Sequence, residues 1–490
     1  MYYKKIDSVK EYVFDITSLA QVWYDGEDSN KTGANGIVLK AYSDTANAYA
    51  MFSTINNKAA NNNYFTPLFV IHYRDTKGLD GRWTYNSQSA GGAGTGNVNL
   101  FTGNLVFAHD DIATNGEILP LTVSHVYNTH QSAEQYEYRK DQLNSTPVYG
   151  GATVGMGFKL SIQETIAYQE IDNQDWYVYN DADGTELYFF YDSTKGKYIS
   201  EDGYDLTLTI SNNVYTMSDS VGNTKKFNSS GMLYEQKDLH GNKKTITYSN
   251  GRIATVTHTP AGGTAKTQLT FTYNSAGALQ KITNAEDTTE YVSFEYSSTP
   301  RGTVSANNAG YLRTVTHSKG AGNCTYEYFD GGRLKYAIDS ATGTKLVYQY
   351  NQTQNYSAEY AMIDSVSEYN SSGTMGQKIG FIYGAETTAV RTSGKDDAYG
   401  NSDDLLTHYV FDDQGRTISA YSTNLTKTEV YGASNAEYSP TQQGSKKNHT
   451  ITKDSASGVP AINLLKNHNA ESGSNWSMYN SGTGYTTTLT

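Results

Sequence analysis

The sequence has few of the residues on which covalent cross-links and electrostatic binding sites depend. Its 490 residues include one cysteine, Cys324, and seven prolines, and charged residues make up only 18% of the chain. A single cysteine excludes an intrachain disulfide, and we expect Cys324 to be a small buried hydrophobic residue rather than a reactive thiol. The net charge of −13 includes no stripe of clustered lysine and arginine. Binding to phosphates requires such a stripe, so we expect no nucleic-acid partner.

Long hydrophobic runs are also missing. No stretch of about 18–20 apolar residues is present, which predicts no membrane insertion by a helix. The first residues are basic but lack the apolar segment of a signal peptide.

Motifs for catalysis or metal binding are absent too. The histidines form neither His-Glu-x-x-His nor His-x-His, and no Gly-x-Ser-x-Gly is present. His258, His317 and His408 occupy equivalent repeat positions, which favours a structural role. Asp110 and Asp111 are adjacent, so on a strand they point to opposite faces and cannot flank one bond together. We therefore predict no enzyme activity, no metal and no cofactor.

Two local patterns suggest ligand loops but favour plainer interpretations. The glycines within 91–96 are not followed by the Lys-Ser/Thr of a phosphate loop, so we expect a bend that leads into a strand. Asp181, Asp183 and Gly184 resemble the start of a calcium loop, but Asp192 stands where a glutamate is required. An Asp-Gly hairpin turn is the favoured interpretation.

A short recurring phrase is present instead. It consists of an aromatic residue, one to three small or polar residues, glycine, any residue, an aliphatic residue and a polar or β-branched strand. It occurs as YSNGRIATVTH (248–258), FTYNSAGALQKITN (271–284), YEYFDGGRLKYAID (326–339) and YVFDDQGRTISAYS (409–422), with looser copies at 227–238 and 309–317. Repetition at a short period indicates stacked supersecondary units rather than a single enzyme core.

Each repeat is predicted to be a β-hairpin. Strand-like runs at Met232–Lys237, Lys244–Tyr248 and Arg252–Thr257 are separated by turns rich in glycine and asparagine, which accept the positive φ of tight hairpins. Consecutive hairpins should pair edge to edge into a long antiparallel sheet.

Tyrosine is unusually frequent, with 43 tyrosines against 15 phenylalanines. A buried tyrosine keeps a hydroxyl that needs a partner or water. One interpretation is a curled sheet around a broad, partly hydrated interior. The other is that tyrosine suits exposed strands. Composition alone leaves both open.

The repeats resemble the YD-repeat family, also called Rhs repeats, over about residues 180–430. The family hallmark is an aromatic residue followed by Asp/Asn-x-x-Gly-Arg-Leu. It is carried by Phe329-Asp330, Gly332-Arg333-Leu334, Phe411-Asp412 and Gly415-Arg416. The resemblance implies an all-β fold, in which the hairpins form a curved or spiral antiparallel sheet as a partial hollow shell. The repeat-signature residues expected to hold this structure are Gly231, Gly251, Arg252, Gly277, Gly332, Arg333, Leu334, Gly415 and Arg416.

The resemblance also bears on function. Toxin-carrying relatives end their shell with a core rich in Asp-Pro-x-Gly, where self-cleavage releases the cargo. None of the seven prolines here follows an aspartate. We therefore assign no catalytic residue by resemblance and expect any toxin to lie outside this chain.

Both ends of the chain resemble parts of sugar-binding modules. Residues 1–75 resemble the C-terminal half of a DNRLRE-type β-sandwich, and 461–490 resemble the opening strands of a carbohydrate-binding β-sandwich. Trp23, Tyr24 and Trp476 are the candidates for stacking on sugar rings, although a core position is the favoured interpretation for each. We expect the chain to be part of a longer polypeptide.

The predicted organisation has five parts. They are a partial β-sandwich at 1–75, a lead-in segment at 76–178, the repeat array at 179–432, a linker at 433–460 and the start of a β-sandwich at 461–490. The function we expect is that of a non-enzymatic spacer or shell in a large secreted or cell-surface bacterial protein, with a possible polysaccharide or cell-surface glycan partner. The alternatives are the encapsulating shell of a toxin-delivery protein, whose effector lies outside this chain, and a glycan-active enzyme.

Overall fold

The computed structural model describes residues 2–6, 9–13 and 77–424, except for gaps at 115–117, 133–153, 172–173, 202–203, 306–307, 321, 352–361, 385–386, 394–397, 402–403 and 413. The chain divides into two compact units. One comprises Met1–Asp75, Tyr431–Thr452 and Asn463–Thr490, and the other comprises Thr76–Val430 and Lys453–Ile462. The predicted lead-in segment and repeat array are thus parts of the same unit.

The first unit contributes one described element, an antiparallel hairpin. It pairs β1 (Tyr2–Ile6) with β2 (Val9–Val13). The predicted linker at 433–460, the module at 461–490 and the rest of the 1–75 module lie outside the described residues.

The second unit is dominated by a curved antiparallel sheet, here called the outer sheet, in which 23 strands follow one another in chain order. Its strands are β8 (Thr165–Ile171), β9 (Gln174–Asn180), β10 (Glu186–Asp192), β11 (Lys197–Ser200), β12 (Thr207–Ser211), β13 (Val214–Ser218), β14 (Thr224–Phe227), β15 (Leu233–Lys237), β16 (Lys243–Ser249), β17 (Arg252–Thr259), β18 (Lys266–Tyr273), β19 (Leu279–Asn284), β20 (Tyr291–Ser297), β21 (Val304–Ser305), β22 (Tyr311–His317), β23 (Cys324–Tyr328), β24 (Leu334–Asp339), β25 (Lys345–Tyr350), β26 (Ile363–Tyr369), β27 (Met375–Tyr383), β28 (Thr387–Thr392), β29 (Leu405–Phe411) and β30 (Thr417–Asn424). The only departure from simple succession in the described residues is β20, which pairs with both β21 and β22.

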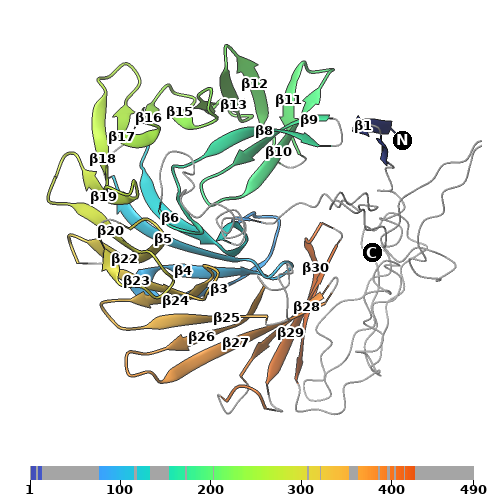
Figure 1. Ribbon diagram of the computed structural model, residues 1–490, viewed down its shortest axis with the longest axis vertical. Helices are drawn as coiled ribbons and strands as arrows, with labels where there is room; N and C mark the ends of the chain where they lie inside the picture. The colour runs from blue at the N-terminus through green and yellow to red at the C-terminus, as the bar shows by residue number, and fades with distance from the viewer. Residues whose placement is uncertain are drawn as a thin grey trace, which may run out of the picture. The chain divides into compact units, whose positions relative to one another are not determined.

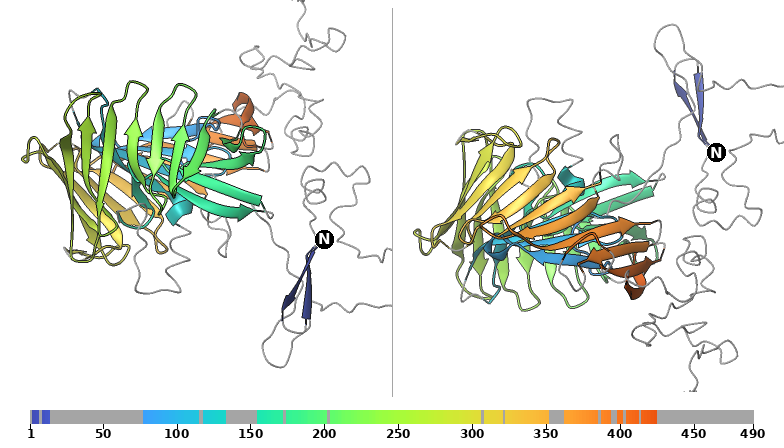
Figure 2. Two further views of the ribbon diagram at one scale, coloured as in Figure 1. Left: turned by 90° about the horizontal axis from the view of Figure 1, so that it is seen from above. Right: turned by 90° about the horizontal axis from the view of Figure 1, so that it is seen from below.

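The outer sheet is an open arc. Its first strand, β8, pairs with β9, its last strand, β30, pairs with β29, and no pairing among the described residues joins β30 to β8. Figure 1 shows the two ends of the arc on the same side of the unit. Figure 2 shows the strands side by side in chain order, green to yellow in one view and yellow to orange in the other.

The strands arise where the sequence predicts them. In the segment used to define the repeat, β15, β16 and β17 match the three predicted runs to within two residues. Between 230 and 420 every described residue belongs to a strand, a turn or an irregular connection. The prediction of an all-β array of antiparallel hairpins is confirmed.

Each repeat carries a β-bulge at its aromatic residue. The pairing register shifts next to Tyr248, Tyr273, Tyr296, Tyr328 and Tyr350. A bulge bends its strand and increases the local twist. Bulges repeated at equivalent positions therefore account for the curvature of the sheet.

The same tyrosines, together with Tyr383, bind each hairpin to the one before it. Each hydroxyl donates a hydrogen bond to the backbone carbonyl of the aliphatic residue that follows the preceding turn, at 2.5–2.9 Å. The pairs are Tyr248 with Leu233, Tyr273 with Ile253, Tyr296 with Leu279, Tyr328 with Leu312, Tyr350 with Leu334 and Tyr383 with Ile363. We call this series the tyrosine ladder.

A second sheet lies within the arc of the first (Figure 1). This inner sheet is antiparallel and contains β3 (Tyr85–Ser89), β4 (Thr95–Asn99), β5 (Leu105–Ala113), β6 (Thr122–Asn128) and β7 (Phe158–Leu160). A 3₁₀ turn, Gly91–Ala93, connects β3 to β4, which is the bend expected for this glycine-rich stretch.

Aromatic side chains pack the inner sheet against the outer sheet. Tyr326 of β23 contacts Phe107 of β5 and Phe158 of β7, with ring centres 5.8 and 5.3 Å apart. All three rings are at most 2% exposed. Burial stabilises this cluster, and so does the edge-to-face geometry of the Phe107–Tyr326 pair.

Neither interpretation of the tyrosine count describes the tyrosines of the ladder. Tyr296, Tyr328 and Tyr350 are buried, at 1%, 0% and 5% exposure. A backbone carbonyl accepts a hydrogen bond from each hydroxyl, so neither a hydrated interior nor an exposed strand is needed.

No helix in the described part of the chain is both long and apolar enough to cross a membrane.

Candidate functional site

The candidate sugar-stacking residues Trp23, Tyr24 and Trp476 lie outside the described residues. The repeat-signature residues all lie within them. Their positions show how the repeats are joined.

The signature glycines share a left-handed backbone. Their φ values are 73° for Gly231, 73° for Gly251, 83° for Gly277, 85° for Gly332 and 76° for Gly415. Only glycine adopts such angles without steric strain. At four of the five positions a Cβ would also lie within 2.4 Å of an atom of another segment, which at Gly277 is the flexible end of an arginine side chain. The approaching residues are Ile166 at Gly231, Arg252 at Gly277, Met156 at Gly332 and Phe101 at Gly415.

The signature arginines contact the following repeat. The guanidinium carbon of Arg252 lies 5.7 Å from the ring centre of Tyr273, and that of Arg333 lies 5.0 Å from the ring centre of Tyr350. Leu334 is fully buried, and its carbonyl accepts a hydrogen bond from the hydroxyl of Tyr350. One repeat thus holds the tyrosine of the next at both its ring face and its hydroxyl.

The last signature arginine acts within its own turn. Arg416 forms a 2.7 Å ion pair with Asp412, whose carboxylate also accepts the backbone N–H groups of Gln414 and Arg416. This arrangement stabilises the final hairpin turn of the array.

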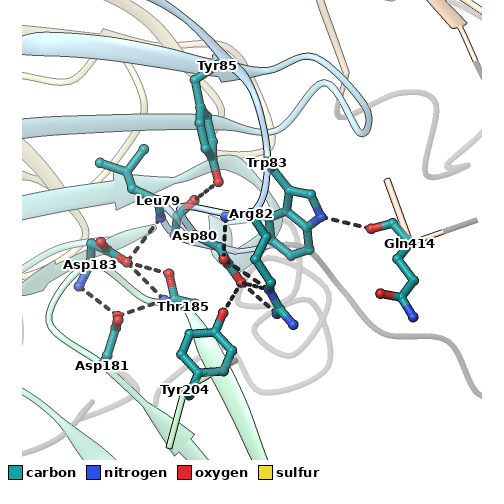
Figure 3. A network of polar contacts seen from close by, with 11 residues as sticks. Leu79, Asp80, Arg82, Trp83, Tyr85, Asp181, Asp183, Thr185, Tyr204 and Gln414 are labelled. Carbon is teal, nitrogen blue, oxygen red and sulfur yellow. Dashed lines mark hydrogen bonds and ion pairs between the residues drawn. The ribbon is translucent and has the colours of Figure 1, made fainter. Parts of the chain in front are cut away.

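A segment at residues 77–85, here called the clasp, contacts both ends of the arc (Figure 3). At the first end, the backbone N–H of Leu79 donates to Asp183 in the β9–β10 turn at 3.1 Å. At the last end, the indole N–H of Trp83 donates to the carbonyl of Gln414 in the β29–β30 turn at 3.0 Å. The clasp therefore spans the opening between the two ends of the arc, from the β9–β10 turn to the β29–β30 turn.

An ion pair inside the clasp holds it to the outer sheet. Asp80 accepts three hydrogen bonds from the guanidinium of Arg82, at 2.7–3.2 Å, and one from its backbone N–H at 2.9 Å. It also accepts one from the hydroxyl of Tyr204 at 2.5 Å. Burial raises the pKa of Asp80, but the hydrogen bonds from Arg82 and Tyr204 outweigh it, so the pKa lies below its ordinary value. The carboxylate is thus charged at neutral pH.

The loop that resembles a calcium site is a hairpin turn. Asp181 Oδ1 accepts the backbone N–H groups of Asp183, Gly184 and Thr185 at 2.9–3.1 Å. Asp183 caps the same turn and also holds the clasp. These carboxylates are therefore engaged in shaping the β9–β10 connection.

The main chemical feature of the unit is a buried polar group between the two sheets, here called the histidine cluster. It consists of His109 and Asp111 on β5, His125 on β6, His317 at the end of β22, and Cys324 and Tyr326 on β23. His109 and His125 are direct cross-strand partners. The cluster thus draws residues from both the inner and the outer sheet.

Hydrogen bonds link most members of the cluster. Asp111 Oδ1 lies 2.7 Å from His125 Nδ1 and 3.2 Å from His109 Nδ1. His125 Nε2 lies 2.7 Å from the hydroxyl of Tyr326, which the thiol of Cys324 approaches at 3.2 Å. Asp111 and His125 are almost completely excluded from solvent, at 5% and 0% exposure.

Charges in the cluster are set by burial and by these contacts. Burial raises the pKa of Asp111, but His125 and His109 outweigh it and bring the pKa to about 2. Burial lowers the pKa of His109, yet its bond to Asp111 raises the net pKa above the ordinary value. Burial keeps the pKa of His125 below its ordinary value and lowers that of His317 to about 4.

Sequence motifs did not reveal the cluster, because its members come from four strands spread over 218 positions of the chain, His109 to Tyr326 inclusive. One signal was present locally. Asp110 is exposed and Asp111 is buried, as alternation on a strand predicts. A histidine and an aspartate two residues apart, His109 and Asp111, therefore share the buried face of β5, and buried polar residues are uncommon without a partner.

A cavity of about 220 Å³ lies between the start of β6, the β7–β8 connection and β15–β17. Its carboxylate, Glu164, is bonded to the hydroxyl of Tyr179, to Lys225 Nζ at 2.6 Å and to Gln236 Nε2 at 3.2 Å. Because these side chains occupy both carboxylate oxygens, Glu164 acts as a structural anchor.

No protein-family model matches the sequence, and no curated protein matches it. Among solved structures, the chain is similar to the crystal structure of TcdB2-TccC3-Cdc42, at 11% identity and a TM-score of 0.23, over 66% of this chain and 19% of that chain. It is also similar to TcdB2-TccC3, at 12% identity and a TM-score of 0.22, over 67% and 21%. A porin-like protein from Bacteroides uniformis is similar at 12% identity and a TM-score of 0.19, over 57% and 96%. The chain spans about a fifth of the first two structures, and at these TM-scores the description of the fold rests on the strand pairings.

Proposed function

We propose that this chain is a non-enzymatic structural unit of a secreted or cell-surface YD-repeat protein, in which it acts as a rigid spacer or shell. The observation that carries the proposal is the tyrosine ladder. Six buried or half-buried tyrosines each bind the backbone of the preceding hairpin, in addition to the strand pairing itself. Such contacts resist the sliding and opening of neighbouring hairpins.

The clasp supports the same role. An open antiparallel sheet exposes unpaired edges and can uncurl. Trp83 and Thr84 contact Gln414 and Thr417 at the end of the array, while Leu79 contacts Asp183 near its start. The clasp restrains the two ends of the arc, which suits a unit that bears load or encloses volume.

A hydrolysis assay tests the non-enzymatic part of this proposal. The purified full chain is incubated with a panel of plant and host polysaccharides, and new reducing ends are measured. We expect no release of sugar above a heat-denatured sample. Release that depends on the folded chain would overturn the proposal.

Glycan binding is a separable part of the proposal. It rests on the resemblance of the terminal segments to sugar-binding modules, with Trp23, Tyr24 and Trp476 as stacking candidates. A glycan array with the full chain measures it, and W23A and W476A variants serve as matched tests. Binding that both variants retain would exclude these residues, and no signal from any glycan would leave only the structural role.

The alternative is the encapsulating shell of a toxin-delivery protein, within a longer polypeptide that carries the effector. The curvature of the outer sheet favours this alternative, whereas the inner sheet takes up part of the concave side. The two roles differ in a protection assay on the longer polypeptide. A shell would shield a downstream effector from protease until the array is unfolded, whereas a spacer would leave it accessible.

A further inference from the structure

We propose that His109, Asp111 and His317 form a binding site for one divalent transition-metal ion of the zinc type. One potential ligand atom from each of the three residues lies within 4.8 Å of the others. Two imidazoles and a carboxylate are a common donor set for zinc. The site goes beyond the structural function proposed above, since it would join the two sheets.

Two buried atoms of this set have no hydrogen-bond partner among the described residues. They are Asp111 Oδ2 and His317 Nε2. Leaving a buried polar atom unsatisfied costs about 1–3 kcal/mol, and more when the group is charged. A cation placed between these atoms would satisfy both at once.

The bonds around Asp111 and His109 orient them for such an ion. His125 holds Asp111 Oδ1 at 2.7 Å, which leaves Oδ2 as the available oxygen. His109 Nε2 lies 3.1 Å from the carbonyl of Gly92 and 3.0 Å from that of Gly322. A histidine that donates one N–H to a carbonyl presents its other nitrogen as a metal ligand. Here that nitrogen is Nδ1, which is hydrogen-bonded to Asp111 Oδ1 at 3.2 Å and would exchange this bond for one to the ion.

The distances require only small movements. Tetrahedral zinc with bonds of about 2.0–2.2 Å places its ligand atoms roughly 3.3–3.6 Å apart. The three atoms must therefore approach one another by at most about 1.5 Å, which side-chain rotation at His317 can supply because this residue is half-buried.

The connection after β22 lies beside the site. Gly322 lies against both imidazoles, and a Cβ there would be 3.2 Å from His109 Nε2 and 3.3 Å from His317 Nε2. Lys319 and Gly320 of the same connection are exposed. The site thus lies next to an exposed turn.

A second triad, His109, His125 and Cys324, also has ligand atoms within 4.8 Å of one another. It is the weaker candidate, because His125 and Cys324 contribute no buried atom without a partner, whereas the first triad has Asp111 Oδ2 and His317 Nε2. Both nitrogens of His125 are bonded, to Asp111 and Tyr326. The thiol of Cys324 is likewise bonded to Tyr326. The test therefore includes a variant of each triad.

The experiment measures Zn²⁺ binding to the full chain after treatment with chelator, by calorimetry and by metal analysis of the dialysed protein. We expect one equivalent of Zn²⁺ and a rise in the melting temperature when the ion is added. H317Q should weaken binding by at least about 10–100-fold, since loss of even an outer partner has an effect of this size. H408Q is the matched control, because His408 is also a half-buried histidine on a strand of the outer sheet.

Each remaining outcome decides against the proposal. No binding by the wild-type chain, or equal binding by wild type and H317Q, would overturn it. Loss of binding in C324S with retention in H317Q would assign the ion to the second triad instead. Far-UV circular dichroism of each variant separates loss of the site from loss of the fold, and D111N provides a second variant if H317Q does not fold.

Discussion

The hydroxyl of Tyr296 donates a 2.7 Å hydrogen bond to the backbone carbonyl of Leu279, which lies in the hairpin before it. Tyr296 is 1% exposed, so this bond is formed without competition from water. The same relationship recurs along the array. Each tyrosine therefore has two roles. Its ring fills the core, and its hydroxyl fixes the register between neighbouring repeats.

Removal of one such hydroxyl should destabilise the protein. In Y296F the carbonyl of Leu279 loses its partner while the ring stays, so we expect a loss of about 1–2 kcal/mol in the free energy of unfolding. Chemical denaturation measures the change. Y191F is the control, because Tyr191 is 53% exposed, and a similar loss in both variants would contradict a special role for the ladder.

Two signature glycines allow the cost of a left-handed backbone to be separated from the cost of a steric clash with a neighbouring strand. Gly231 and Gly251 both have φ of 73°, but a Cβ at Gly231 would lie 1.9 Å from the carbonyl oxygen of Ile166, whereas one at Gly251 would have nothing within 4 Å. G251A should cost about 1–2 kcal/mol, the penalty for a left-handed residue with a side chain. G231A should cost more by about 1–3 kcal/mol, because β8 must move away. Equal melting temperatures for the two variants would show that β8 does not approach Gly231.

The clasp should depend on pH through Asp80. The pKa of Asp80 is lower in the folded protein than its ordinary value of 3.8. A carboxylate with a depressed folded pKa contributes stability above its unfolded pKa and loses it as the pH falls through the folded value. We therefore expect the stability contribution of the clasp to be complete above about pH 4 and to fall below it.

Denaturation of wild type and D80N between pH 2 and pH 7 checks this dependence. D80N should be less stable than wild type near neutral pH, and the difference should shrink in acid. D330N is the control, because the side chain of Asp330 is 89% exposed. A constant difference between wild type and D80N across the range would contradict the assignment.

The bond from Trp83 to Gln414 should protect the end of the array. W83F keeps an aromatic ring but removes the indole N–H that reaches the β29–β30 turn. We expect faster amide hydrogen exchange in β29 and β30, with β16 and β17 unchanged. W176F serves as the control, since Trp176 packs on Tyr188 and Phe190 near the other end.

The single cysteine gives a test of packing between the sheets. Cys324 is 1% exposed and lies beside Tyr326. A maleimide reagent should modify it slowly in the native chain and rapidly in denaturant. Rapid modification of the native protein would show that the β22–β24 region opens readily.

The all-β class, the hairpin as the unit of repetition and the position of most strands in the array can all be predicted from the amino-acid sequence. Turn glycines such as Gly277 and strand runs such as Arg252–Thr257 are local signals, because backbone conformation depends on neighbouring residues. The hydrogen-bond partner of each tyrosine hydroxyl could not be predicted from local sequence, because it depends on the distance between two hairpins.

The roles of the lead-in segment and of the polar residues depend instead on how the two sheets pack. The tertiary structure places the strands β3–β7 inside the arc and lets Leu79 and Trp83 contact its two ends. It also gathers His109, Asp111 and His317 from β5 and β22, which lie more than 200 positions apart. A search for spaced motifs detects ligands that share one element. Here the ligands come together because two sheets pack face to face, and that packing follows from the buried area and curvature of the complete array rather than from any single stretch of sequence.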